Sequence, residues 1–210
     1  MYCFIISGRN EIVKSHIIVQ GSKIFKRSYE NTDKDAIPIL LLHGAAFSSE
    51  TWQEKTKTLQ FLKSKGYEPF ALDLPGKGNP PSDNIDDMKK SEFVRDAIAV
   101  LGISSPVVVS PSMSGSYSIP FLMIHPDEIR GFIPVAPTIP DEYSEKFSEV
   151  KVPTLIIYGE NDTSFVNGRK KLLSAIPQSE IVEIPNGSHP CYLDNPDLFH
   201  KSILDFLKTL

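Results

Sequence analysis

The sequence is poor in cysteine. Only Cys3 and Cys191 occur in the 210 residues, and they lie near opposite ends of the chain. A single pair so far apart provides neither a disulfide framework nor the ligand spacing of a metal site. We therefore expect a protein of a reducing compartment that holds no metal ion.

The sequence also lacks an excess of positive charge and a long apolar run. With a formal net charge of -4, the chain has no basic footprint for direct nucleic-acid binding. The apolar residues 2–6 are too few to span a bilayer and lack the features of a signal peptide. Two N-glycosylation patterns, at Asn161 and Asn186, adjoin the site inferred below, where a glycan would crowd it. We expect a cytoplasmic protein that contacts neither membrane nor nucleic acid.

The composition is that of an ordinary globular domain, with 40% hydrophobic and 23% charged residues, and the length suits one α/β unit. We expect residues 1–210 to form a single domain, with residues 1–11 as a flexible segment or an extra strand in front. No internal repeat and no linker interrupts the chain.

Strand and helix patterns alternate, which indicates a mostly parallel sheet with helices on both faces. Strands are predicted at residues 17–19, 23–27, 37–42, 68–72, 106–110, 131–136, 152–158 and 180–184. Helices are predicted at residues 49–65, 91–101, 114–124, 169–176 and 197–208. In such a sheet, functional residues gather at the carboxyl ends of the strands.

Ser112 lies in a turn of small residues between a predicted strand and a predicted helix. This is the context of a nucleophile elbow, in which the strained serine needs small neighbours two positions away on each side. Glycines are usual there, whereas this chain has Ser110 and Ser114, so the pattern is less specific. Taken alone, such a run is more often a loop or a helix cap.

Two later strand ends supply partners for Ser112. Asp162 follows one predicted strand, and His189 lies in the loop after the next. Parallel strands bring these ends to one edge, and Ser, Asp, His is the chain order of a triad on this kind of sheet. Glu160 is the alternative carboxylate, but Asp162 is preferred because it follows the turn. His189 would serve as general base and acid, and Asp162 would orient it.

An oxyanion hole of two backbone N–H groups should complete the site. We expect them at Met113, directly after the nucleophile, and at Ala45, in the loop after the strand 37–42. Ala46 is the second choice of donor, and Ala46 and Phe47 are expected to contact the substrate.

Other candidate residues have weaker support. His43 precedes the serine, which is the wrong order for a base of this fold, so we interpret it as structural. Cys191 has no elbow around it and is interpreted as a packed thiol. The glycines after the strand 68–72 do not form a dinucleotide motif, and we expect no permanently bound cofactor.

Several stretches together resemble the alpha/beta-hydrolase domain-containing protein 14 group, and the similarity extends from about Ile17 to the C-terminus. The stretches are residues 41–44, 47–52, 73–76, 110–115 and 187–194. The Ser-Pro-Ser elbow and the His-Pro-Cys-Tyr-Leu-Asp block are the most specific of them. The group has an A form with an N-terminal membrane anchor and a soluble B form. This chain shows no anchor and looks like the B form.

The resemblance implies an α/β-hydrolase fold and a serine hydrolase of the cytosol and nucleus that acts on small acyl esters. The B form is described as a protein-lysine deacetylase that passes the acetyl group to coenzyme A, and as a partner of a general transcription factor. The group's triad positions correspond to Ser112, Asp162 and His189. Coenzyme A would thus be an acyl acceptor, and acetylated protein lysines a second class of substrate.

The interval 137–151 bears on the substrate, because many α/β-hydrolases insert a helical cap there. It has room for one or two helical turns only, so we expect no cap domain and a site with little apolar wall for long acyl chains. A lipase is a weaker alternative for the same reason. The main alternative is a protein-interaction module on the same fold with little or no catalysis.

Overall fold

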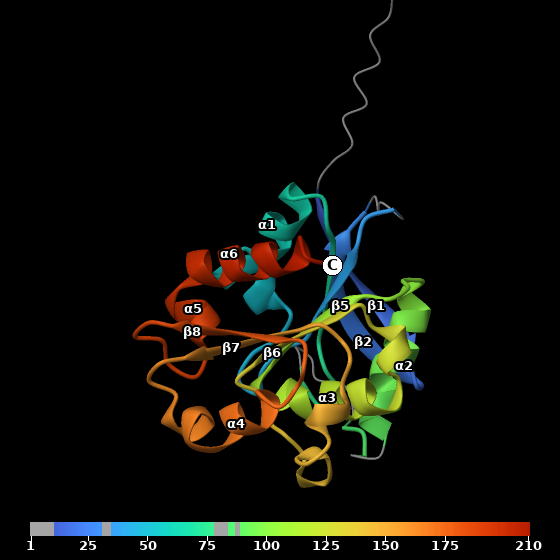
Figure 1. Cartoon of the computed structure of the whole chain (residues 1–210). Helices are drawn as coiled ribbons and strands as arrows, with labels where there is room; N and C mark the ends of the chain where they lie inside the picture. Colours follow the sequence, from blue (N-terminus) through green and yellow to red (C-terminus); the bar gives the residue numbers. More distant parts are fainter. Residues whose placement is uncertain (1–10, 31–34, 78–83, 87–88) are drawn as a thin grey trace, which may run out of the picture.

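The computed structural model describes residues 11–30, 35–77, 84–86 and 89–210 (Figure 1). The expectation for the first eleven residues therefore lies outside the described part, apart from Glu11. Eight strands form one sheet in the order β1-β2-β4-β3-β5-β6-β7-β8. They are β1 Ile12–Val19, β2 Ser22–Tyr29, β3 Pro38–Leu41, β4 Glu68–Leu72, β5 Val107–Pro111, β6 Gly131–Val135, β7 Thr154–Gly159 and β8 Ser179–Ile184.

Strands β3 to β8 pair in parallel, while β2 is antiparallel to both β1 and β4. The α-helices are α1 Thr58–Ser64, α2 Lys90–Leu101, α3 Gly115–Ile124, α4 Lys170–Leu173, α5 Cys191–Asp194 and α6 Pro196–Leu207. Figure 1 shows α1, α5 and α6 on one side of the sheet and α2, α3 and α4 on the other. The predicted mostly parallel α/β sheet with two helical layers is confirmed.

The two faces of the sheet have separate hydrophobic cores, because side chains alternate along each strand. On β5, Val108 packs on the face covered by α2 and α3, whereas Val107 and Val109 pack on the face covered by α1 and α6. All three are fully buried. Burial on both faces explains why the central strands read as continuous apolar runs.

The first two strands are longer than predicted. β1 and β2 pair along their whole length, from Ile12 opposite Tyr29 to Val19 opposite Ser22. β1 lies at the edge of the sheet, and polar and apolar side chains are mixed along it. Its apolar pattern is therefore weaker than that of a central strand, which is why only its end was predicted.

The helix predicted at residues 49–65 is wrong in one respect, because two helices occupy this interval. A π-helical turn, η1 (Thr51–Lys55), is followed by α1, and Lys57 between them has a left-handed φ of 57°. Trp52 is fully buried and donates its indole N–H to the carbonyl of Leu42 at 2.8 Å. The helix predicted at 169–176 is shorter in the structure, where α4 covers Lys170–Leu173 and directly follows a π-helical turn, η7 (Phe165–Arg169).

The helix predicted from residue 114 begins with a 3₁₀ turn, η3 (Ser112–Ser114), before α3. A further 3₁₀ turn, η4 (Pro126–Glu128), precedes β6. Between β6 and β7, where every residue is described, the chain forms two 3₁₀ turns, η5 (Asp141–Tyr143) and η6 (Phe147–Glu149). The prediction of no cap domain is confirmed.

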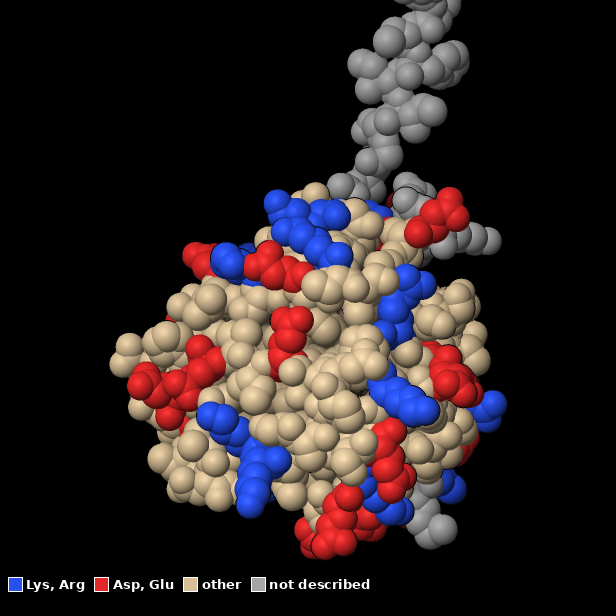
Figure 2. All heavy atoms as spheres, in the orientation of Figure 1, with Lys and Arg blue, Asp and Glu red and all other residues tan. Residues whose placement is uncertain are grey.

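Two features are absent from the described residues. In this part of the chain no helix is both long enough and apolar enough to cross a membrane. The same residues contain no cluster of three or more His, Cys, Asp or Glu side chains that could hold a metal ion. On the face seen in Figure 2, basic and acidic side chains are interspersed in small groups.

Candidate active site

Ser112 lies at the turn between β5 and η3, and its backbone is left-handed, with a φ of 50°. A residue from the segment after β6 stabilises this conformation, because Thr138 N–H donates to the Ser112 carbonyl at 2.8 Å. The segment carrying Thr138 also packs directly on the helix. A Cβ at Gly115 would approach the Thr138 carbonyl oxygen to 2.2 Å, so only glycine fits there. Ser112 is thus half-buried and fixed in the strained backbone geometry expected of a nucleophile elbow.

Three buried serines join β5 to α3 beneath Ser112. The hydroxyl oxygen of Ser110 lies 3.0 Å from that of Ser114 and 2.6 Å from that of Ser118. The Ser114 hydroxyl also donates to the carbonyl of Pro111 at 2.7 Å. The two serines that replace the usual glycines are therefore small enough for the elbow, and their hydroxyls have partners, as buried polar groups require.

His189 lies between Ser112 and Asp162. Its Nε2 is 2.8 Å from the Ser112 hydroxyl oxygen, and its Nδ1 is 2.5 Å from Asp162 Oδ2. A carboxylate only accepts hydrogen bonds, so Nδ1 carries the hydrogen and Nε2 of the neutral ring is free to accept from Ser112. The structure brings together all three predicted residues. Ser112 follows β5, Asp162 follows β7 and His189 follows β8. The His189 side chain is 43% exposed, so the site opens to solvent.

Asp162 is buried and accepts several hydrogen bonds. Its Oδ1 accepts from the Ser164 hydroxyl at 2.7 Å and from Phe165 N–H at 3.2 Å, while Oδ2 faces His189. Burial alone would raise the pKa of this carboxyl, but the bonds from His189, Ser164 and Phe165 outweigh burial and lower the pKa of Asp162. Asp162 is therefore held as the charged acceptor that a neutral His189 needs.

The loop that carries His189 is anchored at several points. The Gly187 carbonyl accepts from Asn161 N–H at 2.8 Å. Asp194 Oδ2 accepts both the backbone N–H and the hydroxyl of Ser188, each at 2.6 Å. A Cβ at Gly159 would lie 2.3 Å from the carbonyl oxygens of Gly187 and Ser188, so the loop rests directly on the end of β7. These anchors limit the positions that the imidazole can take.

The loop after β3 lies beside Ser112. A Cβ built on Gly44 would be 3.5 Å from Ser112 Cβ. The next residue is Ala45, whose N–H donates to no backbone acceptor in the described ranges. Met113 is the second residue of η3, where an N–H group has no acceptor within its own helix. The N–H groups of both predicted oxyanion donors therefore have no backbone acceptor among the described residues.

His43 supports this loop and is not part of the triad. Its Nδ1–H donates to the Gly44 carbonyl at 2.9 Å, and its Nε2 accepts from Leu74 N–H at 2.9 Å. Burial lowers the pKa of His43, only partly offset by its bond to Gly44, which keeps the ring neutral in this role. Further along the loop, Ala46 is exposed and Phe47 is half-buried, with its ring against Gly44.

Cys191 is fully buried, and burial raises the pKa of its thiol to about 12. A thiol that stays protonated is a poor nucleophile, which agrees with its interpretation as a packed residue.

Sequence reasoning missed Ser164 and Asp194 as supports of the triad. The block from Gly187 to Asp194 could have indicated Asp194, since it was recognised as specific without a role for each residue.

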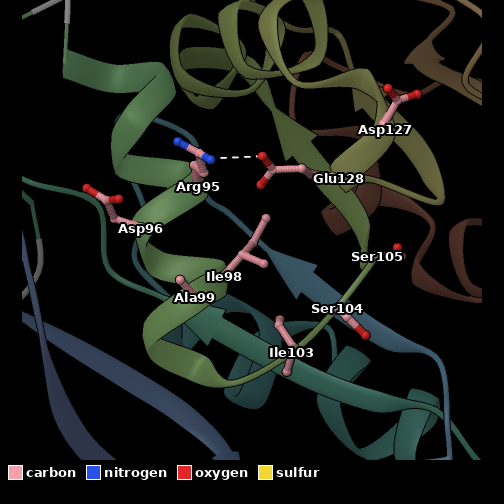
Figure 3. A pocket seen from close by; sticks show the side chains of 9 residues that line it. All are labelled: Arg95, Asp96, Ile98, Ala99, Ile103, Ser104, Ser105, Asp127 and Glu128. Carbon is pink, nitrogen blue, oxygen red and sulfur yellow. Dashed lines mark hydrogen bonds and ion pairs between the residues drawn. The ribbon is translucent and has the colours of Figure 1, made fainter.

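A surface pocket of about 440 Å³ lies apart from this site, beside α2 and the turn that precedes β5 (Figure 3). Arg95 donates to Glu128 at 2.9 Å across it, above an apolar floor that includes Ile98 and Ile103. The pocket is near the start of β5, whereas Ser112 follows the other end of that strand. No predicted site residue lines it.

Residues 39–144 match a family model described as "Alpha/beta hydrolase family". The chain is 39% identical over 207 residues to "Protein ABHD14A" of Mus musculus, covering 97% of this chain and 83% of that protein. It is 38% identical over 204 residues to "Putative protein-lysine deacylase ABHD14B" of Homo sapiens, covering 92% and 94%. It is 41% identical to "Protein ABHD14A" of Danio rerio but spans only 65% of that protein's length.

Solved structures have the same fold. A hydrolase of Thermoplasma acidophilum described as "CIB-like" superposes with a TM-score of 0.87 and 28% identity, covering 95% of this chain and 99% of that one. The carboxylesterase CesB (YbfK) of Bacillus subtilis superposes with a TM-score of 0.78 and 17% identity, covering 95% and 93%. At that identity, the second likeness shows the fold alone.

Proposed function

We propose a function for this chain, which belongs to the alpha/beta hydrolase family together with ABHD14A and ABHD14B. In this proposal it is a serine hydrolase that transfers short acyl groups through an ester on Ser112. The observation that carries the proposal is the position of His189, within hydrogen-bond distance of both Ser112 and Asp162. A serine hydroxyl is a weak nucleophile until a base accepts its proton, and this arrangement supplies the base.

The proposed reaction begins when the Ser112 hydroxyl oxygen attacks the acyl carbonyl carbon and its proton passes to His189 Nε2. The carbonyl oxygen becomes an oxyanion that accepts hydrogen bonds from the N–H groups of Ala45 and Met113. Asp162 holds the imidazole in place and stabilises its charged form. His189 then gives the proton to the leaving group, and the acyl group stays on Ser112.

In the second half of the reaction, His189 takes a proton from the acceptor, which attacks the acyl-Ser112 ester and releases the free serine. Water as acceptor gives a hydrolase, and the thiol of coenzyme A gives an acyltransferase. Coenzyme A is proposed from the family resemblance, as a substrate and not as a bound cofactor. The similarity to ABHD14B, named as a "Putative protein-lysine deacylase", supports acylated protein lysines as donors beside small esters.

The shape of the site supports short acyl groups on large carriers. Only two 3₁₀ turns separate β6 from β7, and the His189 side chain is 43% exposed. The described residues form no cap over Ser112, so a bulky carrier such as a protein lysine has access to it. A cytoplasmic and nuclear location and a transcription-factor partner are parts of the proposal that rest on the resemblance alone.

A fluorophosphonate probe tests the nucleophile directly. The wild type should be labelled at Ser112, and Ser112→Ala should fold normally, escape labelling and lose roughly 10³-fold or more in kcat for a short aryl ester. Circular dichroism and thermal unfolding would show that the variant is folded. Near-normal ester hydrolysis by folded Ser112→Ala would refute the proposal. A wild type that is neither labelled nor active would favour the alternative, an interaction module on a hydrolase fold.

A further inference from the structure

One hydroxyl near Ser112 has no hydrogen-bond partner among the described residues. It belongs to Tyr192, which follows His189 by three positions and is only 2% exposed. The buried side-chain oxygens that lack a partner and are closed off from solvent are Gln60 Oε1 and Glu68 Oε2. The Tyr192 oxygen is not among them, so the small exposed part of this residue includes its hydroxyl.

The hydroxyl lies on the same side of the β3 loop as the nucleophile. A Cβ built on Gly44 would be 3.8 Å from the Tyr192 oxygen, 3.5 Å from Ser112 Cβ and 3.5 Å from the ring of Phe47. These are ordinary contact distances, so the space in front of Gly44 admits an atom. That space is bounded by Tyr192, Ser112 and Phe47, next to the Ala45 N–H group.

The ring of Tyr192 is held by other aromatic side chains. Its centroid lies 5.0 Å from that of Trp52, 5.8 Å from that of Phe199 and 6.2 Å from that of Phe47. Trp52 is itself fixed by its hydrogen bond to Leu42. These contacts position the ring, and its hydroxyl borders the space beside Ser112.

The hydroxyl is the accessible atom of an otherwise buried residue and bonds to no described residue, so it is free to donate to a molecule that enters the site. Burial also raises the pKa of Tyr192, so the phenol is a protonated donor at neutral pH. A rigid, protonated donor beside a nucleophile is the kind of group that stabilises developing negative charge, because it needs no reorganisation when the charge appears.

We propose that Tyr192 is a further catalytic residue of this site, whose hydroxyl donates a hydrogen bond to the substrate carbonyl oxygen as that oxygen becomes an oxyanion. It would act together with the N–H groups of Ala45 and Met113. No bond to Tyr192 forms or breaks, and the phenol keeps its proton throughout. The inference rests on the proposed acyl transfer at Ser112, and it adds a side-chain donor to the two backbone donors.

The test is Tyr192→Phe, which removes the oxygen and leaves the ring. We expect kcat for a short aryl ester to fall by about 100-fold, as for loss of one oxyanion donor, with little change in KM. A trifluoromethyl ketone that forms a charged hemiketal with Ser112 should bind weaker by the same factor. The melting temperature should stay nearly the same, because the hydroxyl bonds to no described residue and its loss breaks no hydrogen bond within that part of the chain.

Tyr158→Phe is the matched control. The Tyr158 hydroxyl donates to Glu183 at 2.6 Å, and Tyr158 packs in the hydrophobic core on the other face of the sheet from Tyr192, so this variant should lose stability and keep its kcat. The two variants thus separate a catalytic hydroxyl from a structural one.

Each outcome decides between the two proposals. Wild-type protein that no fluorophosphonate labels would end the proposed function, and this inference with it. Wild-type protein that is labelled and active, with a Tyr192→Phe variant of equal kcat and equal affinity for the ketone, would overturn the Tyr192 inference alone. A loss of kcat matched by a large drop in melting temperature would also overturn it, because the hydroxyl would then have a structural role.

Discussion

Glu160 and Asp162 follow β7 two residues apart and bind different parts of the same loop. Glu160 Oε2 accepts the backbone N–H of Asn186 at 2.8 Å, whereas Asp162 Oδ2 lies 2.5 Å from His189 Nδ1. One carboxylate thus holds the backbone of the loop and the other holds the imidazole. The two acidic side chains are close in sequence and similar in chemistry, but the structure gives them separate tasks.

This division predicts unequal effects of substitution. Asp162→Asn should lower kcat by about 10⁴-fold, since an amide at this position favours the wrong tautomer of His189. Glu160→Gln keeps an oxygen that can accept from Asn186 and should cost far less. The measurement is kcat for a short aryl ester, with fluorophosphonate labelling as a second readout. Reversed losses would make Glu160 the residue that orients His189.

Asp194 should act as a positioning residue through Ser188. Asp194→Ala removes the acceptor of two hydrogen bonds next to His189. We expect kcat to fall by about 10- to 100-fold, because misplacing a catalytic group by about 1 Å can cost that much. Asp194→Asn retains an acceptor oxygen and should recover most of the activity with KM unchanged. Equal loss in both variants would show that the charge of Asp194, and not its hydrogen bonds, is what matters.

The buried serines beneath the elbow should contribute to stability more than to turnover. Ser118→Ala removes the closer of the two hydroxyl partners of Ser110. Loss of one buried hydrogen bond should cost about 1 kcal/mol, which lowers the melting temperature by roughly 2–4 °C in a protein of this size. Ser202→Ala is the control, because the half-buried Ser202 hydroxyl bonds only to the Leu198 carbonyl one turn earlier in α6, and it should change the melting temperature less. An equal shift in both would mean that the serine network adds nothing.

His200 should make stability depend on pH. Its Nε2 lies 3.0 Å from the Thr58 hydroxyl in the contact between α1 and α6, and Phe61 stacks on the ring. Burial lowers the pKa of His200 in the folded state. As the pH falls below about 6.5, His200 takes up a proton in the unfolded chain before it does so in the folded protein. The stability that His200 contributes above this pH is therefore lost as the pH falls from about 6.5 to the lower pKa of the folded state.

The measurement is the melting temperature of wild type and His200→Gln from pH 7.5 to pH 5. The variant should show a smaller decrease over this range, because it lacks the group that takes up the proton on unfolding. Parallel curves for the two proteins would contradict a contribution from His200.

The lack of a cap predicts a preference for short acyl groups. The value of kcat/KM should be highest for acetyl to butyryl esters and should fall for octanoyl and longer chains, since added methylenes find little apolar surface to cover. In a deep pocket each would contribute about 0.8 kcal/mol. A chain-length series of aryl esters is the test, followed by acetylated peptides with and without coenzyme A. A steady rise toward long chains would mean that an apolar tunnel exists.

Much of the sheet could be predicted because its signals are local. The central strands are buried on both faces, so each reads as an apolar run, and turn residues mark its end. Parallel pairing then brings the ends of β5, β7 and β8 to one edge of the sheet. The proximity of Ser112, Asp162 and His189 follows from topology alone, whereas their chemical roles remain predictions.

What could not be predicted depends on contacts between distant parts of the chain. The break at Lys57 accompanies the burial of Trp52 against Leu42 and the bond from Thr58 to His200, 142 positions away. Helical spacing carries no trace of such contacts, so a single helix was predicted. The unpartnered hydroxyl of Tyr192 escaped notice for the same reason, since its neighbours come from the loop after β3 and from η1 and α6.

The distribution of the site over the sheet has a consequence for biosynthesis. Ser112 follows β5 and leaves the ribosome long before His189, which follows β8 at the edge of the sheet. Until β8 has docked on β7, the base proposed for Ser112 is not in place and the serine is an ordinary alcohol. Under the proposed mechanism, a partly folded chain should therefore resist acylation. Acquisition of a covalent label would then report that β8 has joined the sheet.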